Sequence, residues 1–338
     1  MIKKILTGVA LSTVVAIGSA VAGETMVFTA WGGTTQDLWN EHIAQPFAKK
    51  NNIKVLMDTP TDYGKIKAMV DSGNVTWDVV DVEYDFAIQA AKQGLLEPID
   101  FSIVDRSKID PRFVTDYAVG SFAFSFVLGR NNDSFKDAKP NEWADLFDLD
   151  KFPGKRAFYK WSSPGALEIA LIADGVKPEK LYPLDLDRAF AKLDTIKGDI
   201  LWWGGGAQSQ QLLASGEAPL GQFWDTRVSM VKKTGVNVDI SWKQNMASAD
   251  ALVVLKGTKN KAAAMKFLSF SSSAEPQAKF AKASMLSPIN VDSKGLMDAE
   301  TWANSVGEHT AGQINLDMKY WADHRDEIAT RWYAWQAK

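Results

Sequence analysis

Tryptophans and carboxylates recur where predicted strands end. The recurring groups are Trp31-Gly32, Glu83-Tyr84-Asp85, Trp161-Ser162-Ser163, Trp203-Gly204 and Trp224-Asp225. In open α/β sheets, ligands bind outside the carboxyl ends of the strands. A tryptophan face attracts a cation by about 2 kcal/mol or more when the pair is desolvated. The pattern therefore predicts a cleft that binds an organic cation between indole rings and carboxylates.

The sequence lacks the motifs of the common catalytic, metal and cofactor sites. It contains no cysteine, which excludes disulfides, thiolate nucleophiles and cysteine-bound zinc. The run Gly204-Gly205-Gly206 continues into neither a dinucleotide motif nor a P-loop, because position 209 is Ser and no Lys-Ser/Thr pair follows. We therefore predict a protein without metal or cofactor that is not an enzyme. A hydrolase with paired carboxylates stays open as an alternative, because such acids are rarely close in sequence.

Length and charge exclude further classes. The chain has 338 residues, which suits two domains, and 46% of them are hydrophobic, so a sizeable core is expected. Its 41 acidic residues nearly balance 38 basic ones. A nucleic-acid binder normally carries a basic face, so this balance argues against that class. We expect a monomer that binds no nucleic acid.

The N-terminus has the pattern of a signal peptide. Lys3 and Lys4 precede an apolar stretch over residues 5–17, and Ala20-Val21-Ala22 gives a cleavage pattern. The apolar stretch is shorter than the roughly 20 residues that span a bilayer. Residues 1–22 are therefore predicted to be removed during export. An exported chain of this size without cysteine fits the bacterial periplasm.

The elements that must position the tryptophans and acids alternate in type. Strands are predicted over residues 25–31, 53–57, 77–82, 156–159, 200–203, 218–224 and 250–255, and helices over 62–72, 85–93, 164–175, 184–196, 208–215, 261–269 and 274–283. Such alternation indicates an α/β fold with parallel sheets. We predict that residues 23–131 and 250–290 form one lobe and 132–249 a second. Residues 291–338 should be mainly helical and pack on the lobes.

Several longer motifs resemble one known family. They are Phe152-Pro-Gly-Lys-Arg-Ala, Leu167-Glu-Ile-Ala-Leu-Ile-Ala-Asp-Gly-Val, Trp202-Trp203 with Gln208 and Gln211-Leu-Leu-Ala-Ser-Gly-Glu, Trp77-Asp78-Val-Val, Gly94-Leu-Leu-Glu-Pro-Ile-Asp and Lys256-Gly-Thr-Lys-Asn-Lys. Together they resemble the spermidine/putrescine-type periplasmic solute-binding proteins of ABC importers (extracellular solute-binding protein family 1). The resemblance implies a two-lobed type II periplasmic-binding-protein fold that closes over one small ligand. It also implies a membrane permease and an ATPase as partners.

The resemblance also assigns roles to individual residues. Trp31 matches the family's ligand-stacking aromatic, and Trp224 matches an aromatic wall of the site. Asp250 matches an acid that holds a ligand amine, while Asp85 falls where the family often has a serine. We therefore expect the ligand's amine near Asp250 and between the two indoles.

Two departures from the family pattern point to a different ligand class. Arg227 stands where polyamine binders carry an acid, and Gly165 and Ala166 replace the acids that follow the proline matched by Pro164. A second ammonium would then lie unpaired in a desolvated cleft, whereas an arginine suits a carboxylate. The predicted ligand is a zwitterion: an ω-amino acid, a betaine-like acid or a sulfonium acid. A linear polyamine is the alternative.

The predicted ligand-binding residues come from both lobes. They are Trp31, Glu83, Tyr84, Asp85, Trp161, Ser163, Trp203, Trp224, Asp225, Arg227 and Asp250. Several of these predictions have structural alternatives. Trp31, Tyr84 and Trp224 could pack in the core, and Asp250 could form a helix cap or a salt bridge at the hinge. Trp202 and Trp203 must point to opposite faces of one strand. An acid at position 83 or 85 suits the cap of the next helix. Arg227 has Asp225 as a neighbouring ion-pair partner.

Overall fold

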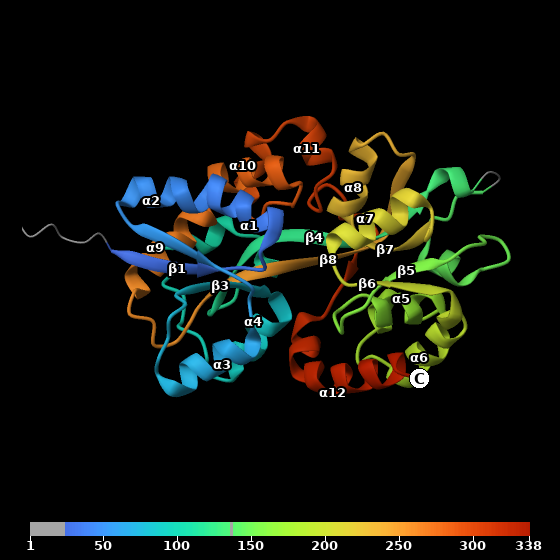
Figure 1. The fold of residues 1–338 in the computed structure, drawn as a ribbon, viewed down its shortest axis with the longest axis horizontal. Helices are drawn as coiled ribbons and strands as arrows, with labels where there is room; N and C mark the ends of the chain where they lie inside the picture. Colours follow the sequence, from blue (N-terminus) through green and yellow to red (C-terminus); the bar gives the residue numbers. More distant parts are fainter. Residues whose placement is uncertain (1–23, 136–137) are drawn as a thin grey trace, which may run out of the picture.

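The computed structural model describes residues 24–135 and 138–338. The predicted signal peptide lies outside these residues. In the described chain, nine strands form one mixed sheet in the order β2-β1-β3-β8-β4-β7-β5-β6, with β9 paired to β8. Helices cover both faces of this sheet along its whole length (Figure 1). The predicted α/β class is confirmed.

Each half of the sheet repeats the same arrangement of strands. In one lobe β1 (Thr25–Thr29) pairs in parallel with β2 (Lys54–Asp58) and with β3 (Val79–Glu83). In the other lobe β5 (Arg156–Tyr159) pairs in parallel with β6 (Ile200–Trp203) and with β7 (Leu220–Trp224). In each of these three-stranded halves, the strand that comes first in the sequence lies between the second and the third. The bounds of β5 and β6 are those predicted from the sequence.

Two long antiparallel strands connect the lobes. They are β4 (Ala118–Asn131) and β8 (Val238–Val254), and both run through the centre of the sheet. β3 is antiparallel to β8, and β7 is antiparallel to β4. Because β4 and β8 run in opposite directions between the lobes, the carboxyl ends of β3 and β7 point toward each other. The topology therefore places the strand ends of both lobes on one central cleft.

The hydrophobic cores separate within these connecting strands. On β4, Ala123 belongs to the core of the first lobe and Phe126 to that of the second. On β8, Met246 belongs to the second lobe and Ala249 to the first. The sequence analysis predicted that the chain passes from the first lobe to the second after residue 131, which is the last residue of β4. β4 runs as one unbroken strand through the point where the two cores meet, so no turn marks that point in the sequence.

The helices of the first lobe lie on both faces of its half of the sheet. Its helices are α1 (Gly33–Trp39), α2 (Gln45–Asn51), α3 (Tyr63–Ser72), α4 (Tyr84–Lys92), α9 (Lys261–Ser271) and α10 (Ala274–Ser284). α1, α2 and α10 lie on one face, and α3 and α4 on the other (Figure 1). Asp62 caps α3 through the backbone N–H of Lys65, and Gly73 ends it with φ 70°, as its left-handed position predicts.

The second lobe is layered in the same way. Its helices are α5 (Ala166–Ala173), α6 (Leu186–Asp194), α7 (Gly206–Ser215) and α8 (Asp225–Lys233). α7 and α8 cover one face, and α5 and α6 the other (Figure 1). The short helix α11 (Ala299–Ala303) and strand β9 (Ile314–Asn315) lead to the last helix, α12 (Met318–Gln336).

Helix α12 is anchored in the second lobe and reaches the first. Trp321 and Trp332 are 1% exposed and belong to the core of the second lobe. The Trp321 indole donates to the buried Glu168 carboxylate at 2.6 Å. On its other side, Asp323 forms an ion pair with Lys92 of α4. The C-terminal segment therefore contacts both lobes.

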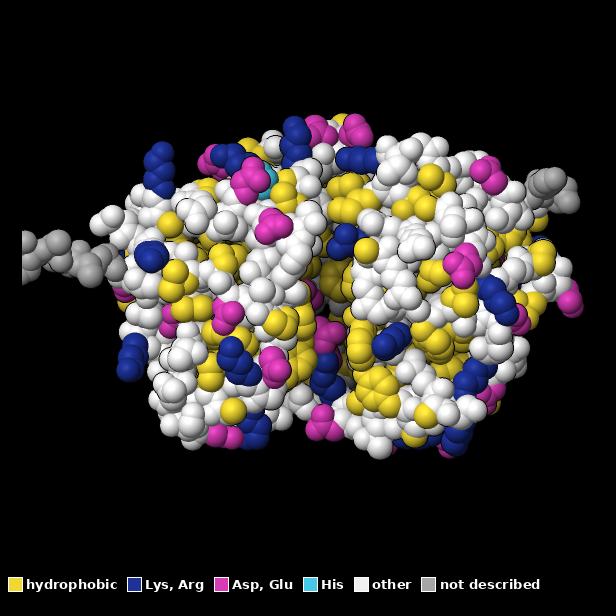
Figure 2. All heavy atoms as spheres, viewed as in Figure 1, with side chains coloured by type: hydrophobic (Ala, Val, Ile, Leu, Met, Phe, Trp, Pro, Cys, Tyr) yellow, Lys and Arg dark blue, Asp and Glu magenta, His cyan; other side chains and the backbone are white. Residues whose placement is uncertain are grey.

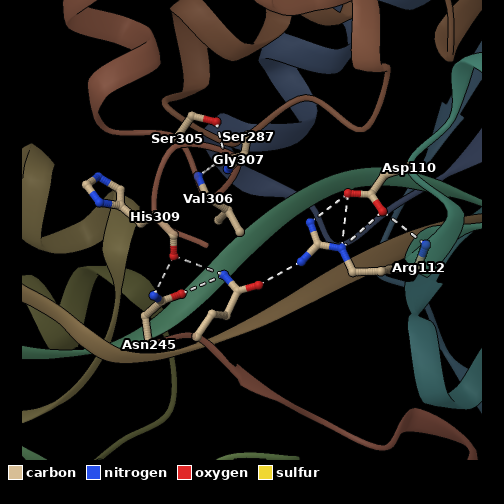
Figure 3. A network of polar contacts seen from close by, with 9 residues as sticks. Asp110, Arg112, Asn245, Ser287, Ser305, Val306, Gly307 and His309 are labelled. Carbon is tan, nitrogen blue, oxygen red and sulfur yellow. Dashed lines mark hydrogen bonds and ion pairs between the residues drawn. The ribbon is translucent and has the colours of Figure 1, made fainter. Parts of the chain in front are cut away.

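A buried polar network crosses the connecting strands behind the cleft. Asn245 of β8 is fully buried, accepts from the Ser125 hydroxyl at 2.8 Å and donates to the carbonyl of His309 at 2.9 Å. Gln313 donates to Asn245 at 2.8 Å and accepts from Arg112 at 2.7 Å (Figure 3). These contacts fix the segment before α12 against both connecting strands. No helix among the described residues is long and apolar enough to cross a bilayer.

Candidate functional site

The carboxyl ends of the strands line a cavity of about 610 Å³ between the lobes. The groove is visible between the two halves of the molecule, with acidic and basic side chains inside it (Figure 2). Its walls differ in charge. Among the described residues, the first lobe supplies four carboxylates, the second lobe supplies Arg227, and α12 supplies Arg325.

The acidic wall is built on two neighbouring strands and one helix start. Asp81 and Glu83 of β3 lie on one face, because side chains alternate along a strand. Asp250 of β8 is directly opposite Glu83 in the antiparallel register. Asp85 follows in the first turn of α4. The Trp31 indole donates to Asp250 Oδ2 at 3.1 Å, so it also orients this carboxylate.

Two of these acids, Asp81 and Asp250, form no ion pair with any described residue. Asp81 is 1% exposed, and its Oδ1 has no hydrogen-bond partner among the described residues. Burial raises the pKa of Asp81 to about 7. Desolvation, followed by the negative charges of Asp81 and Glu83, raises the pKa of Asp250 well above its ordinary value. A bound cation would stabilise the ionised form of both carboxylates.

The other two acids are paired with Arg325 of α12. Its two terminal nitrogens donate to Glu83 Oε2 and Asp85 Oδ2. Tyr63 adds a hydrogen bond to Glu83 Oε2 at 3.1 Å, and its ring lies 5.4 Å below the guanidinium. Burial raises the pKa of Asp85 to about 6, and the positive charge of Arg325 limits that rise. Burial lowers the pKa of Arg325, but the charges of Glu83 and Asp85 outweigh it and raise the pKa above its ordinary value.

The opposite wall presents an arginine without an ion-pair partner among the described residues. Arg227 lies in the first turn of α8, and its Nε has no hydrogen-bond partner. Its Nη1 lies 3.5 Å from the sulfur of Met230. Burial lowers the pKa of Arg227, against the charge of Asp225, yet an arginine starts so far above neutrality that it stays charged. A Cβ on Gly206 would lie 2.4 Å from Arg227 Nε, so glycine makes room for the guanidinium.

Aromatic rings complete both walls. Trp224 packs its ring at 4.9 Å and 82° against Trp203, and at 5.3 Å against Tyr159. The indole N–H of Trp224 has no partner among the described residues. Trp31 and Trp161 line the cavity from opposite lobes and are 42% and 44% exposed. The cavity therefore offers ring faces to a cation.

Most predicted site residues line the cavity. Those that do are Trp31, Glu83, Tyr84, Asp85, Trp161, Ser163, Trp224, Arg227 and Asp250. Their contact with a ligand stays a prediction. The alternatives are less well supported by the geometry, because Glu83 makes no side-chain cap to α4 and Arg227 makes no ion pair with Asp225 among the described contacts.

Two predicted residues lie behind the wall, and this corrects the sequence analysis. Trp203 is fully buried, and its indole donates to the carbonyl of Gln222 at 3.0 Å. Strand alternation turns it into the core between β6 and the helices α7 and α8, where it supports Trp224. Asp225 is 1% exposed and accepts from the backbone N–H of Ser125 at 2.8 Å. Burial raises the pKa of Asp225 to about 7.

Sequence reasoning missed several lining residues, namely Tyr63, Asp81, Tyr159, Arg325 and Tyr333. A local signal existed for Asp81, because it precedes Glu83 by two positions on a strand and must share its face. No local signal identifies Arg325, which reaches the cavity from a helix at the other end of the chain. Among the described residues, no group of three or more histidines and carboxylates is placed to hold a metal ion.

Comparisons with known proteins agree with this architecture. The sequence profile of the bacterial extracellular solute-binding proteins matches residues 42–306. A gamma-aminobutyric acid-binding protein of Pseudomonas aeruginosa is 31% identical over 332 residues, which cover 96% of this chain and 94% of that protein.

Solved structures of binding proteins are also similar to this chain. The structure of a GABA receptor is 59% identical, with a TM-score of 0.91, and the match covers 93% of this chain and 98% of that one. An ABC transporter substrate-binding protein from Bradyrhizobium japonicum is 35% identical, with a TM-score of 0.86 and coverage of 92% and 99%.

Proposed function

The chain belongs to the family of bacterial extracellular solute-binding proteins, and from this premise we propose that it captures a small zwitterion for an ABC importer. It is a binding protein and not an enzyme. Its two-lobed fold with a central cleft is that of the family's solved members. The partners would be the membrane permease and the ATPase of the importer. Export through a signal peptide over residues 1–22 would bring the protein to the periplasm.

The proposed ligand is an ω-amino acid of the size of gamma-aminobutyric acid (GABA). Two relatives carry that ligand in their names, and one of them is 59% identical. The ammonium would lie near Asp81 and Asp250, with the Trp31 ring beside it. The carboxylate would lie at Arg227, where the N–H of Trp224 is also free.

The distribution of charge between the walls is the observation that carries this proposal. A guanidinium without an ion pair among the described contacts faces carboxylates that lack a countercharge. Each wall would leave its charge desolvated and unpaired when the cleft closes, which is unfavourable. A ligand with one ammonium and one carboxylate pairs both. A linear polyamine would pair only the acids and would place a second cation near Arg227.

Isothermal calorimetry with matched ligands tests the proposal. GABA, n-butylamine, butyrate and putrescine share a short aliphatic chain and differ in their charged ends. We expect GABA to bind more tightly than each of the others by at least about tenfold, because a charged hydrogen bond contributes about 1.5–3 kcal/mol. Tight binding of putrescine or spermidine, with GABA ignored, would instead establish the polyamine alternative.

A further inference from the structure

The cavity contains more charge than a zwitterion needs. Four carboxylates line it, and the two arginines beside them are Arg227 and Arg325. Arg227 lies on the second lobe and is free of ion pairs among the described contacts. Arg325 already bridges two of the acids, Glu83 and Asp85. The acidic wall is therefore divided into two halves. Glu83 and Asp85 form the neutralised half, and Asp81 and Asp250 form the open half.

The neutralised half is held firmly by its surroundings. The side chain of Asp85 is 3% exposed and that of Arg325 is 16% exposed, so water screens this pair weakly. Tyr63 holds Glu83 from the far side and places its ring under the guanidinium. α12 itself is fixed in the core of the second lobe by Trp321 and Trp332, whose indoles donate to Glu168 and to the carbonyl of Lys160.

The open half adjoins the neutralised half. Asp250 is directly opposite Glu83 across the β3–β8 pair, and Asp81 shares their face. Without Arg325, the cavity would offer two adjacent acidic sites, one at Asp81 and Asp250 and one at Glu83 and Asp85. A short diamine could then place an ammonium at each. With Arg325 in place, a second ligand ammonium would meet a guanidinium instead.

We propose that Arg325 is a specificity-determining residue that acts as a built-in cation. It occupies the Glu83–Asp85 half of the acidic wall, so that the cleft accepts ligands with one ammonium and rejects diamines. The proposal deepens the proposed function, on which it rests, by naming the residue that sets the number of cations. A purely structural tie between α12 and α4 is the competing explanation.

Two ligands without carboxylates separate these explanations. The ratio of affinities for n-butylamine and putrescine, measured by calorimetry on the full-length chain, depends on how many cations the cleft accepts. The ratio of affinities for GABA and n-butylamine depends on the carboxylate subsite instead. A failure of the zwitterion proposal would therefore appear in the second ratio, and a failure of the Arg325 proposal in the first.

Arg325→Met removes the charge and keeps much of the side-chain length. We expect it to shift the butylamine-to-putrescine ratio toward putrescine by roughly 10- to 150-fold, the effect of one charged hydrogen bond. Arg325→Lys keeps the cation and should retain the wild-type preference. Lys92→Met breaks the other α12–α4 ion pair outside the cavity and should also retain it.

A neutralised variant keeps the test valid if Arg325→Met does not fold. The triple change Arg325→Met, Glu83→Gln and Asp85→Asn removes the cation together with both partner acids. We expect this variant to prefer n-butylamine over putrescine again, as the wild type does. An unchanged ratio in folded Arg325→Met would overturn the proposal. So would an equal loss of all ligands in that variant, or a preference for putrescine in the triple variant.

Discussion

The two lobes share one strand order but place opposite charges at the ends of their strands. The end of β3 carries Asp81 and Glu83, whereas β7 ends at Trp224 and leads to Arg227 in α8. The backbone topology brings both ends to one cavity whatever the side chains are. The fold therefore brings the strand ends of both lobes together, while a few residues at those ends set the charge of each wall.

Reversing the charge of the second wall should have the largest effect. Arg227→Asp would make both walls acidic, so a ligand carboxylate would meet a negative charge. We expect GABA affinity to fall by roughly 30- to 5,000-fold, because an unpaired buried charge costs about 2–5 kcal/mol. Calorimetry with n-butylamine is the control, and its affinity should not fall. An equal loss for both ligands would mean that Arg227 only supports the fold.

Removing the charge of Asp250 should weaken the binding of ligands that carry an ammonium group and leave the others unaffected. Asp250→Asn keeps the side-chain shape and an acceptor for the Trp31 indole. We expect GABA and n-butylamine to lose about 10- to 150-fold in affinity, since a charged hydrogen bond is lost. Butyrate, which has no ammonium, should bind no more weakly than before. A calorimetric titration in which all three ligands respond alike would contradict the assignment of walls.

Truncating the tryptophans should show whether aromatic rings of both walls contact the ligand. Trp31→Ala and Trp224→Ala each remove a ring face, and we expect each to weaken binding by about tenfold or more. Trp31→Phe is a matched control that keeps a ring but loses the hydrogen bond to Asp250. Calorimetry on the three variants measures the effect. Wild-type affinity in both alanine variants would exclude an aromatic cage.

The smallest expected effect is a pH dependence that arises on the acidic wall. The pKa of Asp81 is raised to about 7, mainly by burial. A bound ammonium favours the ionised carboxylate, so binding releases a proton below pH 7 and affinity falls as pH falls. The release of one proton makes the affinity for GABA about tenfold lower at pH 6 than at pH 8. The charged groups of GABA itself do not titrate in this range.

Calorimetry in buffers of different ionisation enthalpy would measure the proton release directly. Asp81→Asn should abolish most of the pH dependence, because it removes the titrating group. A dependence that persists unchanged in this variant would assign the proton to another residue. Asp250 would then be the first candidate, because its pKa is also raised.

The local elements were predictable from the sequence, but their assembly was only partly so. β5 and β6 have the predicted bounds because turns or polar residues mark both ends. β4 was missed because a single strand belongs to both cores and no turn separates its two halves. Trp203 was misplaced because the pattern of two adjacent tryptophans does not say which one faces the core. Arg325 depends wholly on tertiary structure, since only the packing of α12 brings it to Glu83.

The position of α12 at the end of the sequence affects when the parts of the cleft can assemble during export. Arg325 and Tyr333 line the cavity although they lie among the last residues of the 338-residue chain. A chain that crosses a membrane N-terminus first would bring out both sheet halves well before this helix. During that interval Glu83 and Asp85 would have no guanidinium, and the second lobe would lack Trp321 and Trp332 from its core. With the export proposed above, the cleft would reach its complete form only after α12 has crossed the membrane.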